Sequence, residues 1–182
     1  MTKFFKNLFR LMVIKTPWFI ILNYIKNFLP NYKSKNKSKI IEEQIYKNFS
    51  TINQNYKWFC NNLHFLSNSF NDVINIKNIL EIGSFEGRSA IFFLNNFTNT
   101  NIHCIDTWSG SDEHDNFDFN AVEKNFDSNT STFQLNNRLK KFKMTSNEFF
   151  LSNSKKYDLI FVDGDHSCDQ VKIDINNSWK FL

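Results

Sequence analysis

A short apolar run that ends in a glycine-rich turn is the feature that most constrains how this chain folds. Residues 79–83 read Ile-Leu-Glu-Ile-Gly, the turn continues over residues 84–89, and a helical pattern follows over residues 90–97. A strand, a tight glycine turn and a helix in this order form the first half of a βαβ unit. Because parallel strands need crossover helices on the faces of their sheet, the pattern predicts an α/β fold.

The rest of the chain repeats this alternation. Strands are predicted over residues 101–106, 139–144 and 157–163, and helices over residues 117–127, 146–153 and 169–181. Right-handed crossovers between these units give a doubly wound, mostly parallel sheet. Ligands of such sheets bind at the carboxyl ends of the strands, so we expect the functional residues there.

The charge of the chain is unevenly distributed. Residues 1–41 carry nine lysines and arginines and no acid, so the formal net charge of +4 leaves −5 on the remainder. We therefore predict three parts: a basic, apolar N-terminal helical extension and linker over residues 1–39, leading helices over residues 40–77, and an α/β domain over residues 78–182. The lysine-rich run 33–39 is the predicted linker. Because the basic charge is confined to an appendage, we expect no nucleic-acid partner.

Residues 4–29 mix aromatic and apolar side chains with lysines. Their longest uncharged stretch, residues 16–25, is shorter than the ~18 to 20 residues of a membrane-spanning helix, and no small-residue cleavage site follows it. Two interpretations stay open: an interfacial helix with peripheral contact to anionic lipid, and a helix that packs on the domain or on a partner subunit. Three widely spaced cysteines favour reduced thiols and a cytoplasmic location.

Acids stand near the ends of the first two strands of the predicted domain. Glu81 lies two residues before Gly83, and Asp106 closes the next strand. A carboxylate at the end of the second strand, where Asp106 stands, commonly accepts hydrogen bonds from ribose hydroxyls. The glycine spacing is not G-x-G-x-x-G, and no lysine follows as in a P-loop, which disfavours dinucleotides and nucleoside triphosphates as ligands.

The strand over residues 157–163 leads into Asp163-Gly164-Asp165-His166. Two carboxylates and an imidazole at the end of a buried strand must be solvated, paired or bound to a metal. These residues are therefore candidates for chemistry. Asp165 either orients His166 or caps the helix that follows.

Four stretches together resemble the class I S-adenosylmethionine-dependent methyltransferases. More narrowly, they are similar to the small-molecule O-methyltransferase-like group with a VDGDH motif on the fourth strand, called methyltransferase 24-like. The stretches are residues 80–90, 105–110, 144–150 and 157–175. The resemblance implies a Rossmann-like fold and the methylation of a small-molecule or sugar hydroxyl, with S-adenosylmethionine as cofactor.

The resemblance also implies roles for individual residues. Cofactor contacts are implied at Glu81, Gly83, Ser84, Gly87, Asp106, Trp108, Ser146 and Asp163. Among these, Asp106 would hold the ribose, Ser146 would face the adenine and Trp108 would stack near that ring. In metal-assisted members, Asp163 would bind a divalent ion such as Mg²⁺, and His166 would take the proton of the acceptor hydroxyl.

The fold of this family has seven strands, of which the sequence provides the first four. We therefore expect residues 157–163 to form an exposed, apolar sheet edge and the chain to be a C-terminally truncated methyltransferase. Pairing of that edge with another copy would make the protein a homo-oligomer. The alternative function is a truncated or degenerate module that binds S-adenosylmethionine or S-adenosylhomocysteine without turnover.

Overall fold

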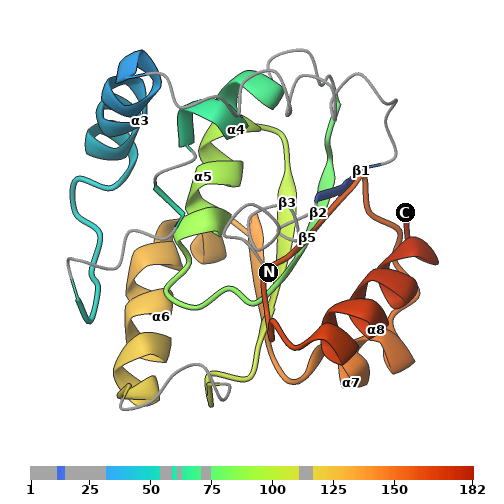
Figure 1. The fold of residues 1–182 in the computed structure, drawn as a ribbon. Coiled ribbons are helices and arrows are strands. Elements are labelled where there is room, and N and C mark those ends of the chain that lie inside the picture. The colour runs from blue at the N-terminus through green and yellow to red at the C-terminus, as the bar shows by residue number, and fades with distance from the viewer. Residues whose placement is uncertain (1–11, 15–31, 54–58, 61–62, 71–74, 111–116) are drawn as a thin grey trace.

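One five-stranded sheet organises the molecule. The computed structural model describes residues 12–14, 32–53, 59–60, 63–70, 75–110 and 117–182. The strands follow the order β1-β5-β2-β3-β4, where β1 is Met12–Ile14, β2 Asn78–Ile82, β3 Asn101–Asp106, β4 Leu139–Lys143 and β5 Leu159–Val162 (Figure 1). Strands β2 to β5 pair in parallel. The predicted doubly wound, mostly parallel sheet is confirmed.

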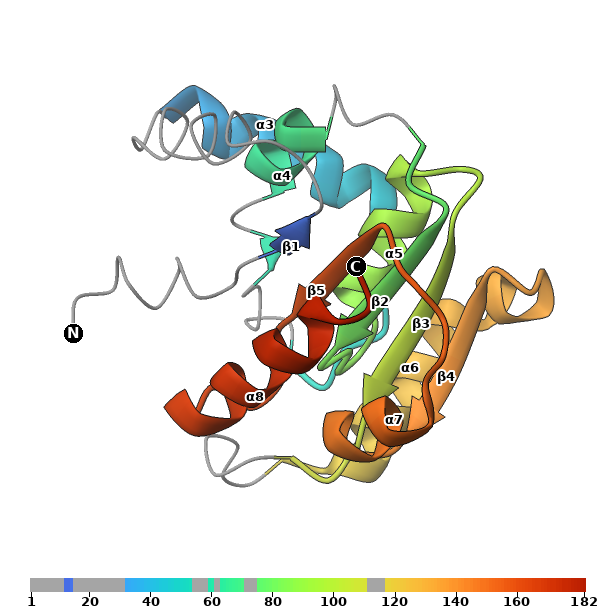
Figure 2. The ribbon, with the colours of Figure 1, turned by 90° about the vertical axis from the view of Figure 1, so that its right-hand side faces the viewer.

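Helices cover both faces of this sheet. On one face lie α3 (Tyr32–Ile45), α4 (Leu63–Phe70), α5 (Arg88–Asn96) and α6 (Phe119–Leu135), and on the other lie α7 (Ser146–Ser152) and α8 (Cys168–Trp179) (Figures 1 and 2). Gly87 is the N-cap residue of α5, and Asp118 is that of α6, where its side chain accepts hydrogen bonds from two backbone N–H groups. Each layer buries its own apolar cluster against the sheet.

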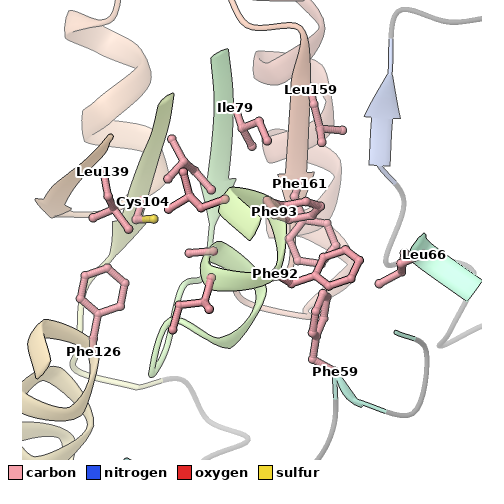
Figure 3. Packing of buried hydrophobic residues seen from close by; sticks show 14 of the residues in the cluster. Phe59, Leu66, Ile79, Phe92, Phe93, Cys104, Phe126, Leu139, Leu159 and Phe161 are labelled. Carbon is pink, nitrogen blue, oxygen red and sulfur yellow. The ribbon is translucent and has the colours of Figure 1, made fainter. Parts of the chain in front are cut away.

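Phenylalanine dominates the core beneath α5. The Phe93 ring lies 5.4 Å from that of Phe161 on β5, and the Phe92 ring lies 5.5 Å from that of Phe59, both edge to face (Figure 3). Because side chains alternate along a strand, Phe161 faces this layer while Ile160 packs in the α7–α8 layer. The β5 strand is buried on both faces, as its continuous apolar sequence predicts.

The edge of β5 is not exposed, which corrects the expectation drawn from the sequence. Met12–Ile14 form an antiparallel strand beside it, with Met12 opposite Phe161 and Ile14 opposite Leu159. The sheet thus has a fifth strand beyond the four predicted, taken from the segment predicted to be helical. The open N–H and C=O groups of a buried strand need partners, and this pairing provides them. Apart from Met12–Ile14, residues 4–29 and the two interpretations of them lie outside the described residues.

The prediction of a linker over residues 33–39 is wrong, because α3 runs through it. The C-terminal part of α3 packs Ile41 and Ile45 against the core. Helix growth is cooperative and lysine is a good helix former, so the packed turns extend back through the basic run. In the described part of the chain, no helix has both the length and the apolar character needed to cross a membrane.

Candidate functional site

The carboxyl ends of β2, β3 and β5 form one edge of the sheet, here called the carboxyl edge (Figure 2). Two backbone hydrogen bonds bring these ends together: Gly83 N donates to Ile105 O at 2.9 Å, and Asp163 N donates to Ile82 O at 2.8 Å. The turn after β2, the acid that ends β3 and the acid after β5 therefore lie side by side. The sequence predicted this convergence because all three follow parallel strands.

The two glycines of the turn are required by close packing. Gly83 has φ of 85°, and a Cβ there would lie 2.3 Å from the carbonyl oxygen of Asp163. Gly87 has φ of 84°, and its Cβ would meet the Thr130 methyl group of α6 at 2.8 Å. Both positions thus need the left-handed conformation and the absence of a side chain. Their predicted contacts with a cofactor stay predictions.

Asp106 holds the loops of the carboxyl edge in place. Its Oδ2 accepts a hydrogen bond from Phe85 N in the glycine turn, and its Oδ1 accepts one from Trp108 N, both at 2.8 Å. A carboxylate offers about four lone-pair sites, so these bonds are compatible with acceptance from a ribose hydroxyl. The sequence predicted an acceptor here but not its hold on the turn.

Glu81 is a fully buried acid beneath the turn. Its Oε2 accepts hydrogen bonds from Ser84 Oγ at 2.6 Å and from the Cys104 thiol at 3.4 Å. Its Oε1 is buried and has no hydrogen-bond partner among the described residues. Burial raises the pKa of Glu81 to about 7. An orphaned oxygen on a side chain that titrates near neutrality is a poised acceptor or donor for a ligand at this edge.

Trp108 is a buried residue beneath the glycine turn, and its predicted stacking near the adenine stays a prediction. The side chain is buried, its ring lies 4.8 Å from that of Phe126, and Lys141 Nζ lies 4.5 Å from the indole ring centre. The indole N–H donates to Phe85 O at 2.8 Å. Trp108 therefore supports the glycine turn from within the core.

Ser146 is the first residue of α7 and is buried. Its hydroxyl donates to Asp174 Oδ1 on α8 at 2.6 Å, and Gln170 Nε2 donates to the same hydroxyl at 3.2 Å. The side chain thus joins α7 to α8, and its predicted place beside an adenine stays a prediction. Burial raises the pKa of Asp174, while the hydrogen bonds from Ser146 and Gln170 oppose this shift.

Asp163 and His166 meet after β5. His166 Nε2 lies 3.4 Å from Asp163 Oδ1, and 42% of the His166 side chain is exposed against 19% of the Asp163 side chain. Asp165 points to the helix instead: its Oδ1 accepts from Ser167 N at 2.8 Å, while Ser167 itself caps α8. Of the two roles open for Asp165, the structure shows the contact at the start of the helix.

A complete metal site is not formed by the described residues. No three histidine, cysteine, aspartate or glutamate side chains come together in that part of the chain. Asp163 and His166 alone do not supply the oxygen-rich shell that Mg²⁺ prefers. The acidic loop over residues 111–116 lies outside the described residues.

Glu86 is a buried residue of the turn that the sequence argument did not single out. Its Oε1 accepts from Ile52 N at 2.7 Å and from Asn125 Nδ2 at 2.8 Å. It joins the glycine turn to the segment before α4 and to α6. An acid between two glycines of a tight turn was the available signal, because a charge there needs a partner.

Comparison with known proteins agrees with this geometry. A family model described as a methyltransferase domain matches residues 80–182, a stretch that includes the glycine turn, Asp106, Ser146 and the Asp163–His166 pair. The chain belongs to this family. The resemblance seen in the sequence is confirmed, and a search of curated proteins gave no match.

A solved structure described as a methyltransferase shares the fold. A Staphylococcus aureus protein described provisionally as a caffeoyl-CoA O-methyltransferase superposes with a TM-score of 0.51 at 20% identity, covering 91% of this chain and 66% of its own. A Bacillus cereus O-methyltransferase in complex with S-adenosylhomocysteine gives 0.46 at 16% identity, covering 86% and 64%. This chain spans about two thirds of the length of the Staphylococcus aureus structure.

Proposed function

We propose that this protein transfers a methyl group from S-adenosylmethionine to a hydroxyl of a small molecule or a sugar. The observation that carries the proposal is the carboxyl edge of a methyltransferase-family domain, where a buried Glu81 oxygen beneath the glycine turn has no partner within the described part of the chain. Family membership supports the reaction class, and the half-exposed His166 supports a hydroxyl acceptor because such an acceptor must lose a proton.

The residues present fit the cofactor. Glu81 Oε1 is an orphaned buried acceptor that a donor group of the ligand would satisfy. Asp106, fixed by Phe85 N and Trp108 N, would accept from the ribose hydroxyls. When bound, S-adenosylmethionine supplies the methyl group to the acceptor oxygen and leaves as S-adenosylhomocysteine. The chain contributes alignment of the hydroxyl with that methyl group, which is most of what such a transfer needs.

His166 is the proposed proton acceptor. Its Nε2 lies 3.4 Å from Asp163 Oδ1, and its imidazole would take the hydroxyl proton as the new oxygen–carbon bond forms. The Asp163 carboxylate would stabilise the imidazolium that results. Mg²⁺ at Asp163 stays a prediction, and transfer assays with added Mg²⁺ or with EDTA test it.

A titration of the full chain with S-adenosylhomocysteine in a calorimeter tests the cofactor proposal. We expect binding to the wild type and to Lys124→Gln, a control on the exposed face of α6. Glu81→Gln keeps the size of the side chain but removes its charge, and should weaken binding at least about tenfold. A wild-type chain that binds no S-adenosylhomocysteine would refute the proposal.

Transfer of radiolabelled methyl to catechol-like and sugar hydroxyls tests the reaction. We expect His166→Asn to lower kcat about 100-fold or more while S-adenosylhomocysteine affinity is unchanged. Equal turnover by His166→Asn and the wild type would remove His166 from the base role. Binding of S-adenosylhomocysteine without transfer to any acceptor would favour the alternative of a binding module without turnover.

A further inference from the structure

A basic cavity lies at the amino ends of β3 and β4, at the opposite end of these strands from the carboxyl edge. Its volume is about 490 Å³, and its lining includes Asn101, His103, Asn137, Arg138, Lys140 and Lys155. Asn101 begins β3 and Asp106 ends it, so the cavity and the candidate methyltransferase site are separated by the length of the strand, roughly 17 Å. A volume of this order accommodates a small molecule.

The lysines of β4 have different partners on the two faces of the sheet. Lys141 forms ion pairs with Glu123 and Asp127 of α6, both at 2.8 Å, and Lys143 pairs with Glu123. Lys140 points to the other face, where its Nζ lies 5.0 Å from the centre of the Phe142 ring. The lysines beside α6 thus have acidic partners, whereas Lys140 lies beside the Phe142 ring.

The cations of the cavity have no acid partner among the described residues. Lys140, Lys155 and Arg138 form no ion pair there. The acid nearest in sequence to Lys155, Asp158, accepts hydrogen bonds through Oδ2 from the backbone N–H groups of Lys77 and Asn78. Burial and the nearby Lys140 lower the pKa of Lys155, while Asp158 opposes this shift. Two ammonium groups that repel each other across a hollow are stabilised by an anion between them.

Arg138 is fixed in position at this cavity. Its guanidinium donates to the backbone oxygens of Leu94, Phe97 and Thr100, at 2.9, 2.8 and 3.2 Å, which caps the end of α5. These bonds hold the positive charge in one place without neutralising it. His103 completes the lining, and burial, followed by Lys155 and Lys140, lowers its pKa to about 4. Burial is the main cause of the lowered pKa values of His103 and Lys155, and the neighbouring lysines add to it.

We propose that the basic cavity binds a small phosphate-bearing anion, held by Lys140 and Lys155 and positioned by the side chains of Arg138 and Asn101. Charge-assisted hydrogen bonds from ammonium groups to phosphate oxygens are strong in a partly buried site. The proposal concerns a site separate from the methyltransferase site and does not depend on its activity.

Titration of the full chain with inorganic pyrophosphate at physiological ionic strength tests the proposal. Lys140→Gln/Lys155→Gln removes both ammonium groups, and Lys124→Gln/Lys172→Gln removes the same charge from exposed positions outside the cavity. We expect the first variant to weaken binding at least about tenfold and the control to change it less than about twofold. Lys140→Arg/Lys155→Arg should retain binding. Thermal unfolding of each variant verifies that it is folded.

A second readout locates the anion. In NMR titrations of the histidine ring protons, bound pyrophosphate should raise the pKa of His103 and leave His166 unchanged, because an anion opposes the field of the two lysines. No pyrophosphate binding by the wild type would overturn the proposal. Equal weakening in both double variants would also overturn it, since that result reflects general attraction to positive charge.

Discussion

At the residue scale, burial shifts the pKa values of Glu81 and His103 in opposite directions. The pKa of Glu81 is raised to about 7 and that of His103 is lowered to about 4. Both groups are therefore driven toward their neutral forms in the folded chain. Between about pH 4 and pH 7, the contributions of the two groups to the free energy of unfolding change in opposite directions with pH. The pH dependence of wild-type stability therefore does not reveal either contribution by itself.

The variant Glu81→Gln isolates the contribution of the Glu81 carboxyl group to the free energy of unfolding. The folded state holds the Glu81 proton more tightly than the unfolded state, whose ordinary pKa is 4.5. This stabilisation is complete below pH 4.5 and is lost as pH rises through about 7, by about 3 kcal/mol in all. The stability of the wild type relative to Glu81→Gln should fall by that amount between pH 4 and pH 8. Urea unfolding at each pH measures it, and a constant difference would contradict the buried acid.

The variant His103→Asn isolates the contribution of the imidazole to the free energy of unfolding. In the wild type, His103 Nδ1 lies 2.9 Å from Tyr157 Oη. Here the folded state disfavours the proton, so the stabilisation is present above pH 6.5 and is lost as pH falls through about 4. The stability of the wild type relative to His103→Asn should fall on acidification, by at most about 3 kcal/mol. The same unfolding series measures it, and a rise on acidification would show that His103 is stabilised as a cation.

Residue types could be predicted from the sequence, whereas their partners could not. Glu81, Asp106 and Asp163 were assigned to one edge because each follows a parallel strand. That Trp108 is buried under the turn depends on Phe126 of α6, and that Ser146 donates to Asp174 depends on the packing of α7 against α8. No local pattern in the sequence determines such contacts between distant segments.

At the element scale, β1 decides whether the sheet has an open edge. The four parallel strands could be predicted because their apolar runs and turns are local signals. A three-residue strand carries no such pattern, and its partner β5 lies far along the chain. The α3 helix shows the same limit, since its passage through the lysine run follows from the packing of Ile41 and Ile45.

Val13→Pro/Ile14→Pro tests the pairing of β1 with β5. At least one of these residues donates to β5 in an antiparallel ladder, and proline removes that donor. We expect a loss of about 1 to 3 kcal/mol and faster amide exchange in β5. Light scattering should also detect association through the opened edge. Val13→Thr/Ile14→Thr keeps the donors and should behave as the wild type. Unchanged exchange at Ile160 in the proline variant would contradict the pairing.

At the scale of the whole molecule, the leading segment, which is the part before the predicted boundary near residue 77, shares one core with the α/β domain. Phe59, Leu63 and Leu66 belong to the same buried cluster as Phe93 and Phe161. The Arg88 guanidinium also lies 4.1 Å from the centre of the Phe49 ring. The boundary predicted near residue 77 is therefore a change in sequence pattern between parts that pack together, and we expect them to unfold as one cooperative unit.

Asn129 makes that expectation testable, because this α6 side chain joins the two parts. Its Oδ1 accepts from Ser50 N at 2.8 Å, and its Nδ2 donates to Ser50 O at 2.8 Å and to Glu86 O at 3.0 Å. Asn129→Ala removes three hydrogen bonds and should cost about 2 to 3 kcal/mol. If the chain unfolds as one unit, the urea midpoint falls while the m-value is unchanged, and circular dichroism and tryptophan fluorescence give coincident transitions. Two separated transitions in the variant, or in the wild type, would show that the leading segment unfolds on its own.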